Sequence, residues 1–145
     1  MALEEAYQEV ERQFEIDLLP EQKQSIKAFF EEKNVFVNLP TGYGKSLIFQ
    51  CLPIVSDIVN EKPRASSLML VISPLTALMK DQTDRLNNLG IPAISLVDVD
   101  DPDIIQQVID GLYVIVYCSP EYLLSSTGRD ILKRFYLKKH YLPVF

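Results

Sequence analysis

Five short apolar runs alternate along the chain with longer stretches in which apolar and polar residues mix. The runs are rich in β-branched and aromatic residues and are bounded by turn-forming residues, a pattern that predicts β-strands. They are VFVNL (35–39), LMLVIS (68–73), AISLV (93–97), YVIVYCS (113–119) and YLPVF (141–145).

The intervening stretches have helical spacing. Pro20 suits the first position of a helix over residues 20–32, which places Ile26, Phe29 and Phe30 on one side. A second helix is predicted over residues 45–59, and Pro53 is expected to kink it or to end its first part.

Two further helices end at glycines. The stretch 75–90 stops at Gly90, a residue suited to the position after a helix C-terminus, and 102–111 stops at Gly111. We expect one apolar stripe of the first to face the core: Leu75, Leu78, Met79, Leu86 and Leu89.

Strands that alternate with helices predict an α/β fold. Parallel strands need long crossovers, so we expect a mostly parallel sheet with helices on both faces. Residues 1–13 form an acidic lead that is expected to be helical, and residues 14–145 are expected to form one domain.

Composition narrows the class of protein. The 145 residues are 48% hydrophobic, contain no long apolar run and carry a net charge of −6. We therefore predict an intracellular globular protein without a membrane span, in which Cys51 and Cys118 are reduced core residues.

The acidic balance opposes strong non-specific DNA binding, and the basic run 129–140 is interpreted first as a solvated helix face.

The segment TGYGKS follows a predicted strand and opens a predicted helix, the context that a phosphate-binding loop requires. Backbone N–H groups converge on phosphate oxygens there, lysine reaches the β- and γ-phosphates, and the serine hydroxyl ligates Mg²⁺. Leu39 stands where the full pattern asks for glycine. The segment predicts ATP and Mg²⁺ binding by Thr41, Gly42, Tyr43, Gly44, Lys45 and Ser46.

Three further segments sharpen this prediction: LLPEQKQSI (18–26), SPLTALMKDQ (73–82) and YCSPEYLL (117–124). Together with the phosphate loop they closely resemble the RecQ family of ATP-dependent 3′–5′ DNA helicases in superfamily 2. The resemblance extends from about Phe14 to Phe145 and implies an incomplete RecA-like ATP-binding domain.

The resemblance also implies roles around the adenine. Gln22, 23 residues before Lys45, is the glutamine that reads adenine, and an apolar residue near Ile16 packs on the adenine face. Without the family spacing, Gln22 is interpreted first as an exposed helix glutamine. Leu19 stands where the family has an arginine and Glu15 where it has a glycine, so the adenine pocket is altered.

Single-stranded or partially duplex DNA is the implied macromolecular partner. Ser73, Pro74 and Lys80 correspond to a helicase motif whose start lies close to the DNA strand, where a serine hydroxyl and backbone N–H groups suit phosphate oxygens. In a nucleated cell such a protein is expected in the nucleus.

Hydrolysis needs an acid at a strand end, and the family takes it from a DExH sequence that occurs nowhere in this chain. We therefore expect this segment alone to bind ATP without hydrolysing it. Two alternatives stay open: a non-catalytic nucleotide- or DNA-binding module or remnant, and a small phosphate-loop kinase or NTPase with Asp98 on the metal.

Overall fold

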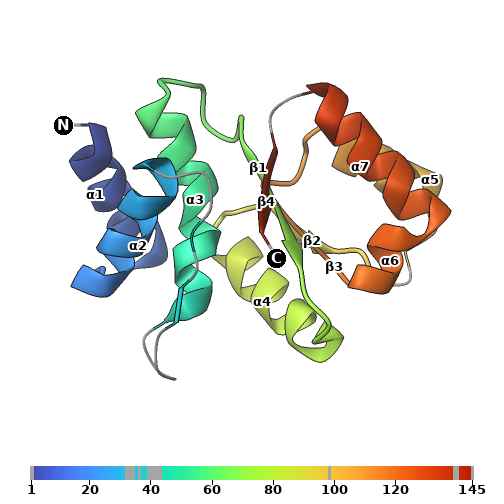
Figure 1. The fold of residues 1–145 in the computed structure, drawn as a ribbon, viewed down its shortest axis with the longest axis horizontal. Coiled ribbons are helices and arrows are strands. Elements are labelled where there is room, and N and C mark those ends of the chain that lie inside the picture. Colours follow the sequence, from blue (N-terminus) through green and yellow to red (C-terminus); the bar gives the residue numbers. More distant parts are fainter. Residues whose placement is uncertain are drawn as a thin grey trace. The chain divides into compact units, whose positions relative to one another are not determined.

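The chain divides into two compact units, Met1–Arg64 and Ala65–Phe145. The computed structural model describes residues 2–31, 35, 37–38, 44–97, 99–138 and 141–144 (Figure 1). The first unit carries the candidate phosphate loop, and the second carries the sheet.

Three helices build the first unit: α1 (Ala2–Phe14), α2 (Pro20–Glu31) and α3 (Lys45–Val59). Pro20 begins α2. Pro53 was expected to kink α3 or to end its first part, and the second alternative is wrong because α3 continues through Pro53. Both α1 and α2 pack against α3. The buried apolar residues of these helices recur at helical spacing and form one core: Ala6, Tyr7, Val10, Phe14, Ile26, Leu47, Ile48, Cys51, Leu52 and Val55.

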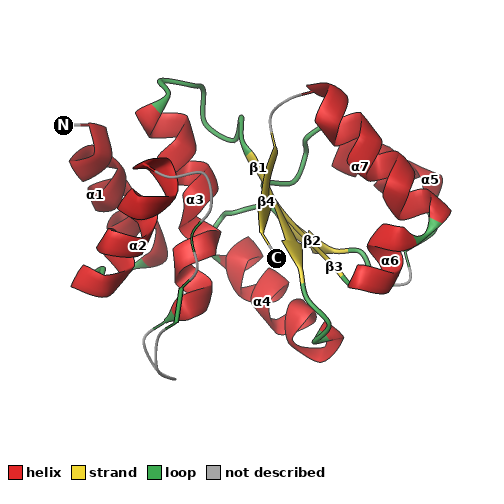
Figure 2. Cartoon of the chain, in the orientation of Figure 1, coloured by secondary structure: helices red, strands yellow, loops and turns green. Residues whose placement is uncertain are grey.

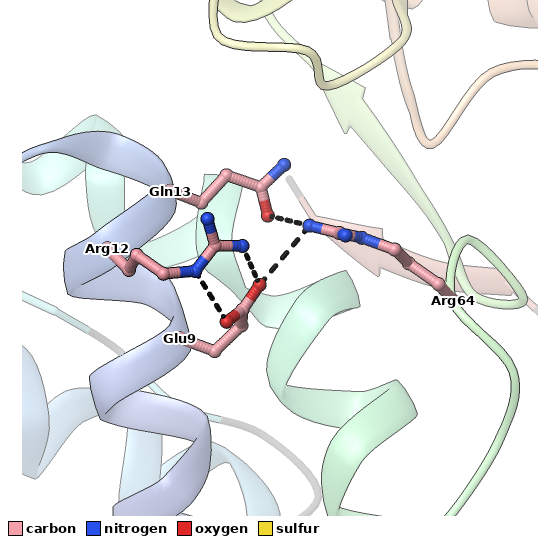
Figure 3. Close-up of polar contacts among 4 residues, drawn as sticks. All are labelled: Glu9, Arg12, Gln13 and Arg64. Atoms are coloured by element: carbon pink, nitrogen blue, oxygen red, sulfur yellow. Dashed lines mark hydrogen bonds and ion pairs between the residues drawn. The ribbon is translucent and has the colours of Figure 1, made fainter.

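A polar cluster fastens the segment after α3 to α1 (Figure 3). Glu9 accepts hydrogen bonds from Arg12 on its own helix, with an Nε–Oε2 distance of 2.9 Å. Arg64 donates to Glu9 over 3.2 Å and to the side-chain oxygen of Gln13 over 3.1 Å. The hydrogen bond from Arg12, and then the charges of Arg12 and Arg64, lower the pKa of Glu9 below its ordinary value.

The predicted strand over 35–39 is not found at the residues of this segment that the structure describes. Val35, Val37 and Asn38 lie outside any strand. A strand exists only where a neighbour pairs with its backbone groups, and the described elements of this unit are all helices. An apolar run by itself does not specify which neighbouring strand its backbone will pair with.

The second unit contains a four-stranded parallel sheet in the order β2-β3-β1-β4. The strands are β1 (Leu68–Ile72), β2 (Ala93–Ser95), β3 (Ile115–Cys118) and β4 (Tyr141–Val144). Each falls within a predicted apolar run. Ile72 pairs with Cys118, so the residues that follow β1 and β3 leave the sheet at the same edge.

Helices cover both faces of this sheet (Figures 1 and 2). They are α4 (Thr76–Asn88), α5 (Pro102–Ile109), α6 (Pro120–Leu124) and α7 (Ser126–Lys138). Alternate strand residues such as Leu70 and Val116 pack with Val108 of α5 and Ile131 of α7. On the other side, α4 contacts β2, where the Ser95 hydroxyl lies 3.6 Å from the Met79 sulfur. The predicted α/β fold with a parallel sheet is confirmed.

The apolar stripe predicted for the helix after β1 is only partly correct. Met79 and Leu86 are buried, but Leu75 is 60% exposed and Leu78 is 51% exposed. Leu75 precedes the helix, which begins at Thr76, and Leu78 lies about 100° around the helix from Met79. The buried face follows Met79, Thr83 and Leu86.

Four helices end in the same backbone motif. In each, the second residue after the C-cap donates back to a carbonyl five residues earlier: Ile16 to Glu11, Lys62 to Asp57, Ile91 to Leu86 and Leu112 to Gln107. The residue before each of these donors adopts a left-handed conformation. Gly90 and Gly111 fill that position in α4 and α5, as predicted, whereas Glu15 and Glu61 fill it in α1 and α3 with φ of 56° and 54°.

Both cysteines are buried and free, as the sequence predicts. Burial raises the pKa of the Cys51 thiol to about 12 and that of the Cys118 thiol to about 11. Thiols that hold their protons so firmly are poor nucleophiles, so both act as small apolar side chains in their cores.

Candidate functional site

Gln22 lies in the first turn of α2 with its side chain turned back toward the start of the helix. Its Oε1 accepts a hydrogen bond of 2.8 Å from the backbone N–H of Leu19, the residue before Pro20. A glutamine at the third helical position commonly satisfies this N–H, which otherwise has no partner in the helix. The contact explains why Gln22 is only 4% exposed, contrary to the interpretation of an exposed helix residue.

The same carboxamide reaches the start of α3. Its Nε2 donates to the carbonyl oxygen of Gly44 over 3.2 Å. Since the Leu19 N–H can only donate and the Gly44 carbonyl can only accept, these two contacts define which end of the carboxamide is oxygen. Capping accounts for the first contact, whereas the second joins α2 to the candidate phosphate loop.

Gly44 enters α3 in a left-handed conformation with φ 63° and ψ 46°. A Cβ atom at this position would lie 2.6 Å from Nε2 of Gln22, closer than real Cβ contacts come. Backbone conformation and close approach therefore both favour glycine here. Without a side chain, Gly44 also cannot cap the first N–H groups of α3.

Lys45 and Ser46 are the first two residues of α3. Lys45 is exposed and Ser46 is half-buried. A helix start combines backbone N–H groups with a positive partial charge, and an ammonium and a hydroxyl stand beside them here. This donor set suits phosphate oxygens and a hard cation. Thr41, Gly42 and Tyr43 lie outside the described residues, as does Asp98.

The turn between α1 and α2 carries the candidate adenine-binding residues. Glu15, where a glycine is usual, has φ 56°, a conformation that glycine adopts without strain. Leu19, where an arginine is usual, is 40% exposed and contributes its backbone N–H to Gln22. Ile16 is half-buried beside the same turn.

Glu11 is a residue of this region that sequence reasoning did not select. Its Oε1 accepts from the Leu18 N–H over 2.9 Å and lies 3.7 Å from Nζ of Lys23. The contact crosses the turn between α1 and α2, where neither the helical nor the strand period continues from one residue to the other. The sequence therefore carried no signal for it.

The candidate DNA-contacting residues lie in the second unit, after β1. The Ser73 hydroxyl accepts from the Leu75 N–H over 3.1 Å, and the Ser73 N–H donates to Cys118 over 3.0 Å. Pro74 is exposed. Lys80 forms an ion pair of 3.1 Å with Asp84, and its side chain is 80% exposed. Ser73 and Pro74 thus lie between the end of β1 and the start of α4, at the carboxyl end of the strands, where ligands of open α/β sheets bind.

A parallel sheet covered by helices, together with a helix entered through a left-handed glycine and followed by lysine and serine, defines the class of phosphate-loop α/β proteins. The sequence profile of the DEAD/DEAH box helicase family matches residues 19–142. The chain belongs to this family.

Curated relatives bear out the RecQ resemblance. The chain is 38% identical over 125 residues to the ATP-dependent DNA helicase hus2/rqh1 of Schizosaccharomyces pombe, covering 81% of this chain and 9% of that protein. It is 36% identical over 117 residues to the bifunctional 3′-5′ exonuclease/ATP-dependent helicase WRN of Mus musculus, covering 79% of this chain and 8% of the relative. It is 36% identical over 110 residues to the ATP-dependent DNA helicase RecQ of Haemophilus influenzae, covering 73% of this chain and 16% of the relative.

The chain thus spans less than a fifth of the length of these three relatives. Within the part that the structure describes, no helix has both the length and the apolar character needed to cross a membrane.

Proposed function

We propose that this chain is the nucleotide-binding part of a RecQ-like, ATP-dependent 3′–5′ DNA helicase, with residues 14–145 belonging to its first RecA-like domain. The observation that carries the proposal is the contact between Gln22 and Gly44. It joins the glutamine that would read adenine to the glycine that opens the phosphate-binding helix, over 3.2 Å. A capping role alone would not require that contact.

In this proposal each residue has one task. Lys45 neutralises β- and γ-phosphate charge, and the backbone of Thr41 through Gly44 donates to phosphate oxygens. Gln22 accepts from and donates to the adenine edge, while Ile16 packs on its face. The tasks agree with the exposure of Lys45 and with the burial of Gln22 beside the helix start.

Mg²⁺ fits the donor set through the hydroxyl of Ser46. Hard cations prefer oxygen ligands, and Mg²⁺ usually takes one or two from the protein and the rest from phosphates and water. When bound, Mg²⁺ would neutralise charge on the triphosphate. The residues of this chain would then contribute the orienting hydroxyl and the lysine charge.

We further propose that the parent protein couples ATP hydrolysis to movement along single-stranded or partially duplex DNA. Ser73 and Pro74 would meet the strand through backbone and hydroxyl donors, and Lys80 would add charge after leaving Asp84. Such a protein would act in the nucleus of a nucleated cell. No DExH sequence occurs among the 145 residues, so the acid required for hydrolysis would come from elsewhere in the parent.

ATP titration of the 145-residue chain and its Lys45→Ala variant tests the nucleotide assignment. Charge-assisted hydrogen bonds contribute roughly 1.5–3 kcal/mol, so Lys45→Ala should weaken ATP binding about ten- to a hundredfold. The matched control is Lys62→Ala, which removes an exposed lysine beyond the other end of α3. Equal affinities of the wild-type chain and the Lys45→Ala variant would overturn the phosphate-loop assignment.

A further inference from the structure

The turn that leads into α2 is held from α1 by one carboxylate. Glu11 Oε1 accepts from the backbone N–H of Leu18 over 2.9 Å. The same oxygen lies 3.7 Å from Nζ of Lys23, in an ion pair with partly exposed side chains. Such exposed pairs contribute little, so the contact with the Leu18 backbone is the stronger constraint.

This contact is the first of three hydrogen bonds that follow one another toward the phosphate loop. Leu18 is bonded to Glu11, and the next N–H along the chain, that of Leu19, donates to Oε1 of Gln22 over 2.8 Å. Nε2 of Gln22 then donates to Gly44 over 3.2 Å. Because peptide units are planar, only the φ and ψ angles of Leu18 separate the two N–H groups, so fixing the Leu18 N–H narrows the directions open to the Leu19 N–H.

We propose that Glu11 is a positioning residue of the nucleotide site, which acts through the Leu18–Leu19 backbone on the carboxamide of Gln22. The inference rests on the proposed function. Within the described part of the first unit, the Glu11 carboxylate contacts Leu18 and Lys23, and it does not contact Gly44, Lys45 or Ser46. It keeps the carboxamide in the one orientation that serves both Leu19 and Gly44, so that Gln22 meets adenine already oriented.

Removal of Glu11 is a local change. The packing of α1 on its neighbours rests on its buried apolar residues, which include Tyr7, Val10 and Phe14. Tyr7 also ties α1 to α2 independently, through a hydrogen bond of 2.8 Å from its hydroxyl to the carbonyl of Lys23. A Glu11→Ala chain should therefore fold with both helices in place.

The first test measures ATP affinity in a double-mutant cycle. Loss of one hydrogen bond that orients Gln22 should weaken ATP binding about three- to tenfold in Glu11→Ala. Glu11→Gln keeps an oxygen acceptor for Leu18 while losing the charge facing Lys23, and it should bind as the wild-type chain does. In a Gln22→Ala background, Glu11→Ala should cause no further loss, because the residue through which it acts is gone.

Glu9→Ala is the matched control for this cycle. It removes a glutamate of the same helix together with its contacts to Arg12 and Arg64, but it leaves the α1–α2 turn untouched. Its ATP affinity should equal that of the wild-type chain.

The second test needs no nucleotide. Amide hydrogen exchange of Leu19 reports the hydrogen bond between Leu19 and Gln22. Glu11 takes no part in that bond and is bonded to Leu18 instead. Glu11→Ala should speed this exchange about fivefold or more, and Glu11→Gln should restore it, while amides in the middle of α3 stay unchanged.

Additive losses of affinity in the double variant, or unchanged exchange at Leu19 in Glu11→Ala, would overturn the inference. A wild-type chain that fails to bind ATP would instead overturn the proposed function and the nucleotide consequence drawn from it. The exchange at Leu19 would in that case still decide whether Glu11 orients Gln22.

Discussion

The side-chain nitrogen of Gln22 donates a hydrogen bond to the backbone carbonyl of Gly44, with 3.2 Å between the two atoms. The residues lie 22 positions apart, on the first turn of one helix and at the entrance of another. Any movement of the carboxamide toward a ligand is therefore linked to the backbone at the start of α3.

Substitution of Gly44 by alanine should break this link. The new Cβ would lie 2.6 Å from Nε2 of Gln22, and alanine would be strained at φ 63°. The conformational strain alone costs roughly 1–2 kcal/mol of the free energy of unfolding, and displacement of Gln22 should add to it.

Gly90→Ala provides the matched comparison for Gly44→Ala. Gly90 has φ 80°, and an added Cβ there would meet nothing within 4 Å, so its cost is conformational only. Urea titrations followed through amide signals of each unit measure both. An equal loss in the two variants would show that the contact between Gln22 and Gly44 contributes nothing.

The end of α1 offers a stabilising change. Glu15 occupies a left-handed position with φ 56°, where α4 and α5 have Gly90 and Gly111. Glu15→Gly should therefore raise the free energy of unfolding of the first unit by about 1 kcal/mol. The reverse change, Gly111→Ala, meets no atom within 4 Å and should destabilise the second unit by a similar amount. A less stable Glu15→Gly chain, in urea titrations followed through α1 amide signals, would contradict this account.

The contact between α6 and α7 depends on Gly128. A Cβ at Gly128 would lie 2.0 Å from the carbonyl oxygen of Tyr122 and 2.7 Å from Cα of Leu123. Both are backbone atoms, so no side-chain rotation can relieve the clash, and the two helices must separate. Gly128→Ala should cost the second unit about 3 kcal/mol or more.

Amide hydrogen exchange of α6 and α7 is the measurement for Gly128→Ala. Ser126→Ala, at an exposed position at the start of the same helix, should leave it unchanged. Wild-type exchange in Gly128→Ala would mean that these helices do not approach as closely as described.

The cluster around Glu9 should make stability depend on pH. Its pKa is lowered, first by the hydrogen bond from Arg12 and then by the charges of Arg12 and Arg64. A carboxyl group with a lowered pKa in the folded state adds stability above its ordinary pKa, and that stability is lost as the pH falls through the folded value.

Glu9→Gln should therefore destabilise the first unit by a few tenths of a kcal/mol at pH 7, as is usual for pairs with exposed partners. The difference from the wild-type chain should shrink as the pH falls below the ordinary pKa of 4.5 and disappear below the lowered pKa of the folded state. Urea titrations at pH 7 and at acid pH measure it, with Glu5→Gln on the same helix as the control. A difference that persists at acid pH would exclude the charge of Glu9 as its cause.

Local patterns of the sequence determined most secondary structure. Apolar runs such as LMLVI and IVYC predicted strands correctly, because a strand that is buried on both faces of a sheet is apolar at every position. Pro20 and the glycines at 90 and 111 set helix boundaries through their own backbone preferences, which act without tertiary contacts. The candidate phosphate site was also indicated by a local pattern, because its glycine, lysine and serine at 44–46 are consecutive in the sequence.

Only the tertiary structure decided which elements meet. The apolar segment 35–39 carried a strand signal, yet its described residues form no strand, because pairing requires a neighbour that periodicity does not name. The sequence pattern predicted that Leu75 and Leu78 belong to the core, but both are exposed. Their burial depends on where the helix begins and on which of its faces meets the sheet. Three successive hydrogen bonds lead from Glu11 through Gln22 to Gly44 and connect α1, α2 and the start of α3. No sequence period predicts these bonds, because they depend on how the three helices pack.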